Sequence, residues 1–141
     1  MKKVLFICTH NSARSQMAEG FVNFYYSKKV TAQSAGTIET TVKPEAIEVM
    51  KEIGIDISKH YSKSVEKFLG EQFDLVVTVC DNAAKTCPFF PGKKIINKSF
   101  KDPSEFKGPA EERLNEFRKI RDEIKQWIVD NLPAELSLND S

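Results

Sequence analysis

Apolar and polar residues follow two distinct patterns along this chain. Short, continuous apolar runs are typical of strands covered on both faces of a parallel sheet, and residues 4–7 form such a run. Further strands are predicted over residues 30–34, over 73–79, which are rich in β-branched residues, and more weakly over 94–97. Between them, apolar residues at helical spacing predict helices over residues 16–27, 44–53 and 114–132 and a short helix over about 64–69. Strands that alternate with helices favour right-handed βαβ units. The predicted fold class is therefore α/β: a single three-layer domain with a four-stranded parallel sheet and helices on both faces.

The length of the chain is compatible with one domain. Its 141 residues fit the usual size of a single domain, which we expect to span residues 1–132, followed by a polar, flexible tail over 133–141. The lysines and apolar run near the start resemble a signal peptide, but the run is too short and lacks a small-residue cleavage site. No apolar run approaches the roughly 20 residues needed to cross a bilayer. The expected location is the cytoplasm.

Charge and cysteine content narrow the classes of function. The chain has 21 basic and 20 acidic residues, a net charge of +1, which gives no reason to expect a nucleic acid or a membrane surface as partner. Its cysteines, Cys8, Cys80 and Cys87, are an odd number for a disulfide-stapled secreted domain. No Cys-x-x-Cys pair occurs, and His10 and His60 lie at no ligand spacing to the later cysteines. We therefore expect a monomer without a metal site or a cofactor.

A polar loop follows the first predicted strand and leads into the first predicted helix. In open parallel sheets, ligands bind beyond the carboxyl ends of the strands. Successive backbone N–H groups that curl into a helix N-terminus form a binding site for a tetrahedral anion. Arg14 returns after five residues as a planar, bidentate clamp on that anion. The predicted oxyanion-binding loop consists of Thr9, His10, Asn11, Ser12, Ala13, Arg14 and Ser15.

Cys8 begins this loop and is the candidate nucleophile. The helix N-terminus and Arg14 should both favour its thiolate form, which is the reactive one. Ser15 is placed to donate a hydrogen bond to the sulfur, and Asn11 tolerates left-handed backbone geometry and can tie the loop. The alternative is that Cys8 is only a small apolar residue at the end of a buried strand. Its position at a strand–helix junction favours the catalytic interpretation.

The run over residues 4–20, which ends Arg-Ser-Gln-Met-Ala-Glu-Gly, resembles the low-molecular-weight protein tyrosine phosphatases and their arsenate reductase branch. The similarity continues through residues 34–37, 44–58, 77–88 and 102–103 and covers the chain to about residue 131. It implies the flavodoxin-like fold of that superfamily and an enzymatic activity. Both branches use the Cys-x5-Arg-Ser loop, so the loop does not separate a phosphatase from a reductase.

Two further cysteines favour the reductase branch. Cys80 and Cys87 match a thiol pair of the arsenate reductases of this fold. Ester hydrolysis needs one cysteine, whereas reduction of arsenate to arsenite takes two electrons, which two thiols supply by forming a disulfide. The resemblance implies that Cys8 forms an adduct with arsenate, Cys80 attacks Cys8 to release arsenite, and Cys87 captures Cys80. Thioredoxin would then reduce the Cys80–Cys87 disulfide. The alternative is that Cys80 is a buried strand-end residue and Cys87 an unused loop thiol.

Asp102 and Pro103 match the acid loop of the family. Asp102 should protonate the leaving oxygen, although a simple Asp-Pro turn is the alternative. Phosphatases of this fold usually carry an aromatic residue next, and Ser104 at that position favours a small inorganic substrate. The expected function is thioredoxin-coupled arsenate reduction. The runner-up is a phosphatase acting on phosphotyrosine or small aryl phosphates, and a third alternative is a non-enzymatic oxyanion-binding or redox-signalling module.

The resemblance also raises the question of a cation. In some reductases of this family, the residues that match Asn11, Glu19 and Ser34 help to form a monovalent-cation site. A further acidic ligand of that site falls near Lys63 in this sequence. The resemblance therefore does not carry this cation site over to the present sequence.

Overall fold

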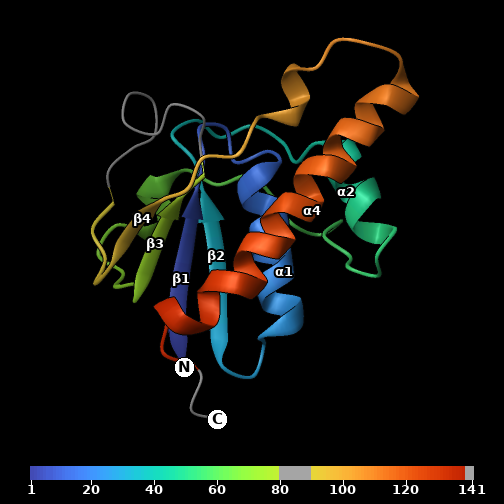
Figure 1. Cartoon of the computed structure of the whole chain (residues 1–141). Helices are drawn as coiled ribbons and strands as arrows, with labels where there is room; N and C mark the ends of the chain where they lie inside the picture. Colours follow the sequence, from blue (N-terminus) through green and yellow to red (C-terminus); the bar gives the residue numbers. More distant parts are fainter. Residues whose placement is uncertain (80–89, 139–141) are drawn as a thin grey trace.

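The computed structural model describes residues 1–79 and 90–138. In this part of the chain, four parallel strands form one sheet in the order β2-β1-β3-β4 (Figure 1). Each of them overlaps one of the predicted strands. The strands are β1 (Lys2–Ile7), β2 (Val30–Ala35), β3 (Leu75–Thr78) and β4 (Ile95–Asn97). Because β1 pairs with both β2 and β3, the strand order reverses at β1, and the carboxyl end of this strand is the place where such sheets bind ligands.

Three α-helices lie together on one face of the sheet (Figure 1). They are α1 (Arg14–Tyr25), α2 (Pro44–Lys51) and α4 (Ala110–Glu135), and two short 3-10 helices are η1 (Val65–Phe68) and η2 (Pro103–Glu105). Helix α4 packs against both α1 and α2. Pro44 occupies the first turn of α2, where a helix needs no backbone N–H donor.

Two apolar clusters enclose the sheet and account for its layers. Side chains alternate across a strand, so Val4 and Phe6 of β1 join the cluster formed with the three α-helices. Leu5 and Ile7 point to the opposite face, where they meet a second cluster that includes Phe68 of η1. These contacts confirm the predicted single-domain, three-layer α/β fold with a four-stranded parallel sheet. In the described residues, the second face is covered by η1 and neighbouring apolar segments.

Helix α4 ends later than predicted. It continues through Pro133 to Glu135, and Leu136 and Leu138 beyond it are still buried in the main core cluster. Pro133 removes one helical hydrogen bond near the end of the helix, and the Leu138 N–H donates to the Pro133 carbonyl at 2.7 Å. Leu136 and Leu138 thus bury apolar surface that a free tail would expose.

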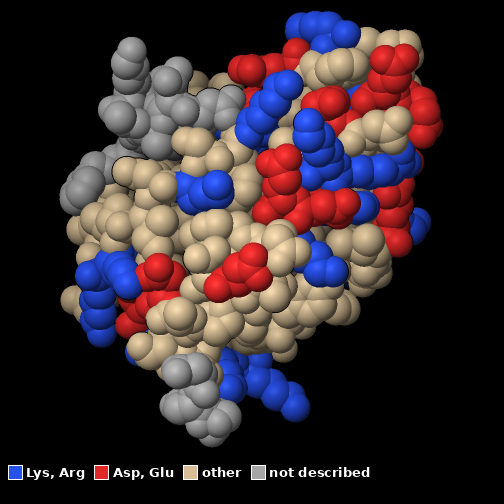
Figure 2. All heavy atoms as spheres, viewed as in Figure 1, with Lys and Arg blue, Asp and Glu red and all other residues tan. Residues whose placement is uncertain are grey.

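The surface over α4 carries interspersed basic and acidic side chains (Figure 2). Arg118 on α4 forms a bidentate pair with Glu52, which follows α2, with the shortest Nη2–Oε2 distance at 2.7 Å. The hydrogen bonds from Arg118 lower the pKa of Glu52 below its ordinary value. Among the described residues, no helix combines the length and apolar character needed to cross a membrane.

Candidate active site

The loop between β1 and α1 lies at the carboxyl edge of the sheet (Figure 1). Backbone hydrogen bonds hold it to the last residue of β2 and to the segment before α2. The Cys8 N–H donates to the Ala35 carbonyl at 3.1 Å, and the Lys43 N–H donates to the Ser12 carbonyl at 2.8 Å. Asn11 has a φ of 51°, in the left-handed region that asparagine tolerates. The loop therefore has a fixed shape, and part of that shape depends on Asn11.

Cys8 and Ser15 meet inside this loop. The Cys8 Sγ lies 2.9 Å from the Ser15 Oγ, and both side chains are buried. The Asn11 Nδ2 donates to the same Ser15 oxygen at 2.8 Å. Because the serine oxygen accepts that bond, its own hydrogen can point toward the sulfur. A hydroxyl donor at this position stabilises a Cys8 thiolate. The structure thus brings together the two side chains that the sequence pattern paired.

Arg14 is the first residue of α1, and its guanidinium is buried at the edge of the loop. Its Nη1 donates to the Phe100 carbonyl at 2.9 Å, and its Nη2 lies 3.5 Å from the Asp102 Oδ2. The N-cap residue Ala13 supplies no side-chain acceptor, and the first turn of α1 carries no acidic residue. The positive end of the helix and Arg14 together favour an anion from outside the chain.

Asp102 is held in a defined orientation by the residue two positions later. Its Oδ1 accepts hydrogen bonds from the Ser104 backbone N–H at 3.0 Å and the Ser104 Oγ at 2.7 Å. This leaves the Oδ2 facing Arg14. In the sequence, Ser104 was noted only because it stands where related phosphatases carry an aromatic residue. Its role in orienting Asp102 was not predicted, because these hydrogen bonds depend on the local turn at η2.

A polar cavity of about 360 Å³ opens over the loop. Its walls come from the loop, from the segment before α2 and from η2. The lining residues are His10, Ser12, Thr40, Thr41, Lys43, Asp102, Ser104 and Glu105. A lining of hydroxyl groups, one lysine and two carboxylates suits a small hydrated ligand better than an apolar one.

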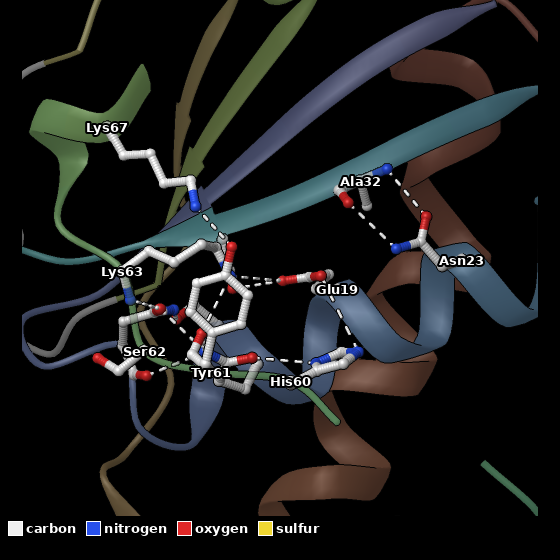
Figure 3. Close-up of polar contacts among 12 residues, drawn as sticks. Glu19, Asn23, Ala32, His60, Tyr61, Ser62, Lys63 and Lys67 are labelled. Carbon is white, nitrogen blue, oxygen red and sulfur yellow. Dashed lines mark hydrogen bonds and ion pairs between the residues drawn. The ribbon is translucent and has the colours of Figure 1, made fainter. Parts of the chain in front are cut away.

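Behind the loop lies a second polar cluster that the sequence analysis only partly anticipated (Figure 3). The Lys63 Nζ lies 3.7 Å from the Glu19 Oε1, which also accepts a hydrogen bond from the Ser34 Oγ at 2.5 Å. The buried ammonium of Lys63 thus lies directly against the carboxylate considered for a cation site. Burial lowers the pKa of His60 below its ordinary value, although the Glu19 carboxylate acts in the opposite direction. Gln16 contacts both His60 and Asn11.

Two of the predicted site residues are not described by the structure. Cys80 and Cys87 lie outside the described residues. The structure places Cys8 beside Ser15 and Arg14 beside Asp102, and the thiol pair stays a prediction. In residues 1–79 and 90–138, no group of three or more His, Cys, Asp or Glu side chains could hold a metal ion.

A buried cysteine hydrogen-bonded to a serine before a helix, together with an arginine paired with a carboxylate that lines a polar cavity, defines the class of cysteine-dependent enzymes that act on tetrahedral oxyanions. The family model described as low molecular weight phosphotyrosine protein phosphatase matches residues 3–140. The chain belongs to this family.

Several members of known description are similar to this chain. An arsenate reductase of Halalkalibacterium halodurans is 44% identical over 128 residues, which cover 90% of this chain and 92% of that protein. A solved arsenate reductase in the phosphate binding state is 34% identical with a TM-score of 0.79, covering 96% of this chain and 99% of that chain. The thioredoxin-dependent arsenate reductase of Corynebacterium glutamicum is 28% identical with a TM-score of 0.60, covering 93% of this chain and 64% of that chain.

Proposed function

We propose that this chain reduces arsenate to arsenite, with Cys8 as the nucleophile. One structural observation carries the proposal: the Cys8 sulfur, hydrogen-bonded to Ser15, lies in the same loop whose Arg14 reaches Asp102. The similarity to arsenate reductases across nine-tenths of the chain supports the choice of substrate. Nucleophile, anion clamp and proton donor are the parts that nucleophilic substitution at a tetrahedral oxyanion needs.

The first step follows from this arrangement. The Cys8 thiolate attacks arsenic, a sulfur–arsenic bond forms, and one arsenic–oxygen bond breaks. The departing hydroxyl group takes a proton from Asp102 and leaves as water, which is a better leaving group than hydroxide. Arg14 and the N-terminus of α1 hold the remaining oxygens and neutralise their charge. Arsenic is still pentavalent at this stage, so a reductant must follow.

Cys80 and Cys87 supply that reductant in the second part of the proposal. The Cys80 thiolate attacks the Cys8 sulfur, a disulfide forms, and the electron pair of the sulfur–arsenic bond leaves with arsenic as trivalent arsenite. Cys87 then attacks Cys80 and releases the Cys8 thiolate. A thioredoxin dithiol reduces the Cys80–Cys87 disulfide by exchange. The similarity to a thioredoxin-dependent reductase supports this partner, and such a cycle belongs in a reducing compartment such as the cytoplasm.

Hydrolysis of phosphate esters is the alternative, and the family to which the chain belongs favours it. The same three side chains would form a phosphocysteine at Cys8, which water then cleaves. Neither Cys80 nor Cys87 has a part in that reaction. Ser104 also offers no aromatic ring to stack on a substrate tyrosine. The thiol pair is thus the feature that separates the two functions.

The order of thiol exchange tests the proposal. Purified protein should release arsenite catalytically when it is given arsenate and a thioredoxin system. Without reductant, Cys87→Ser should accumulate a Cys8–Cys80 disulfide and release about one arsenite per enzyme, as stoichiometric thiol exchange requires. Cys80→Ser should release little arsenite yet still hydrolyse p-nitrophenyl phosphate. Non-reducing peptide mapping by mass spectrometry distinguishes these species.

Two results would overturn the reductase proposal. One is that arsenate produces no disulfide in the wild-type protein. The other is that both serine variants keep the full rate of p-nitrophenyl phosphate hydrolysis while neither the variants nor the wild type releases arsenite. Either result favours the phosphatase.

A further inference from the structure

One lysine lines the cavity over the Cys8 loop, and the reaction proposed above gives it no part. Lys43 lies between β2 and α2 and is the N-cap residue of α2. The same lining also holds His10 and two carboxylates, those of Asp102 and Glu105. Lys43 therefore places a positive charge beside a cavity whose other wall segments carry negative charge.

The backbone of Lys43 is fixed on both sides. Its N–H donates to the Ser12 carbonyl of the oxyanion loop at 2.8 Å, and its carbonyl accepts from the Ala46 N–H at 3.0 Å. A residue that precedes a proline is restricted to extended geometry, and Lys43, which precedes Pro44, has a φ of −65° and a ψ of 132°. The side chain of Lys43 thus starts from a fixed point beside the loop.

The ammonium group of Lys43 is not engaged elsewhere. In the part of the chain that the structure describes, it makes no ion pair, and neither does the carboxylate of Glu105. The nearby carboxylate of Glu45 is paired instead with the Arg113 Nε, at 3.5 Å. Glu45 and Arg113 line a second polar cavity of about 500 Å³, which shares Lys43 with the first. Lys43 and Glu105 are thus opposite, uncompensated charges on one cavity.

The size of the cavity determines whether these charges act on a bound anion. A cavity of about 360 Å³ is roughly 9 Å across, which is about one Debye length at physiological ionic strength. At that separation, a unit charge changes the energy of a doubly charged anion at low salt, and most of the effect disappears at high salt. An exposed lysine elsewhere is only a solvated side chain, whereas here it raises the local concentration of anions.

We propose that Lys43 draws the oxyanion into the Cys8 cavity and that Glu105 opposes it, so that these two charges set the affinity of the site for small anions. The inference rests on the proposed function only in that this cavity receives the oxyanion. Neither residue takes part in the Cys8–Ser15 or the Arg14–Asp102 contact. Their substitution should therefore change KM and leave kcat nearly unchanged.

Lys43→Gln tests the proposal, because it removes the charge and keeps most of the side chain. The readout is the concentration of inorganic phosphate that half-protects Cys8 from iodoacetamide at about pH 8, measured by mass spectrometry of the Cys8 peptide. We expect this concentration to rise by about three- to eightfold at an ionic strength of about 20 mM, and by less than about twofold at 0.5 M. Lys43→Arg keeps the charge and should stay within about twofold of the wild type.

Glu105→Gln tests the sign of the effect. It should lower the half-protecting phosphate concentration by about two- to fivefold at low salt. The double variant Lys43→Gln/Glu105→Gln should return close to the wild type, because it loses one charge of each sign. Lys51→Gln is the matched control, since Lys51 ends the same helix, about 12 Å from Lys43 at 1.5 Å per residue. It removes the same charge and should change phosphate protection by less than about 1.5-fold.

The inference is overturned if Lys43→Gln needs no more phosphate than Lys51→Gln, or if Glu105→Gln weakens the protection. Absence of phosphate protection of Cys8 in the wild type would overturn it as well. These measurements need neither arsenate nor thioredoxin. Loss of arsenite release, with the opposite effects of the two variants intact, would count against the proposed function alone. Normal arsenite release without these effects would count against this inference alone.

Discussion

Gly36 lies where the chain leaves β2 and passes directly under the Cys8 loop. A Cβ atom at this position would lie 2.6 Å from the Cys8 carbonyl oxygen, 2.7 Å from the Thr9 carbonyl oxygen and 2.9 Å from the Asn11 nitrogen. All three are backbone atoms of the oxyanion loop, so no rotamer change can relieve the contact. Gly36 is also held in place, because its N–H donates to the Lys63 carbonyl at 2.9 Å.

The distances set the size of the expected effect for Gly36→Ala. Ordinary contact for a Cβ begins at 3.4 Å, so the loop must retreat by about 0.5 to 0.8 Å, which exceeds the tolerance of a preorganised site. A misplacement of about 1 Å can cost on the order of a hundredfold in rate. We therefore expect turnover to fall by about ten- to a hundredfold. Overpacking should also lower the free energy of unfolding by about 1 to 3 kcal/mol.

Gly20→Ala serves as the control, because its new methyl group meets only side chains. The Cβ would lie 2.8 Å from the Ile57 Cγ2 and 3.3 Å from the Met50 Cε, both in the core between α1 and α2. This variant should lose stability of similar size while the Cys8 loop keeps its shape. Urea unfolding gives the stability of both variants. Protection of Cys8 from iodoacetamide by phosphate reports whether the loop still binds an oxyanion.

We expect phosphate to protect Cys8 in the wild type and in Gly20→Ala, and to protect it weakly in Gly36→Ala. The reasoning is refuted if Gly36→Ala retains wild-type phosphate protection and turnover. That result would mean that the loop adapts to the methyl group without cost, and that its observed shape is not the one that binds the anion.

The remaining predictions concern three charged residues. Arg14→Lys should fold normally but lose on the order of a hundredfold in turnover, because one ammonium cannot both bond the Phe100 carbonyl and present a planar fork to an anion; near-normal turnover would contradict this. Asp102→Asn should slow adduct formation by roughly a hundred- to ten-thousandfold, and the defect should shrink for aryl phosphates with good leaving groups; an equal loss for all esters would make Asp102 structural. The hydrogen bond from the Lys3 backbone N–H holds the pKa of Asp74 below its ordinary value. The ionised Asp74 carboxylate therefore stabilises the fold at neutral pH, and this stabilisation is lost as the pH falls below about 4. Asp74→Asn should flatten the dependence of the urea midpoint on pH in that range.

The local elements and the central chemistry of the site could be predicted from the sequence, because both are written in consecutive residues. The strand at residues 2–7 and the loop that follows it are neighbours in the chain, so Cys8 and Ser15 meet as soon as the helix starts at Arg14. The long apolar stripe of α4 likewise identified a helix. Its end was misplaced, because the burial of Leu136 and Leu138 depends on the surface they reach and not on their own spacing.

Only the tertiary structure decided which distant residues support that loop. Asp102 reaches Arg14 because β3 and β4 place their carboxyl ends beside that of β1. Gly36 and Lys63 meet the loop through the crossover that follows β2. The hydrogen bond between His60 and Gln16 likewise forms only once this crossover is in place. A hydrophobic pattern reports which face of an element is buried but not which partner it meets. Contacts between residues far apart in the chain follow from strand order and packing, and these are properties of the whole fold.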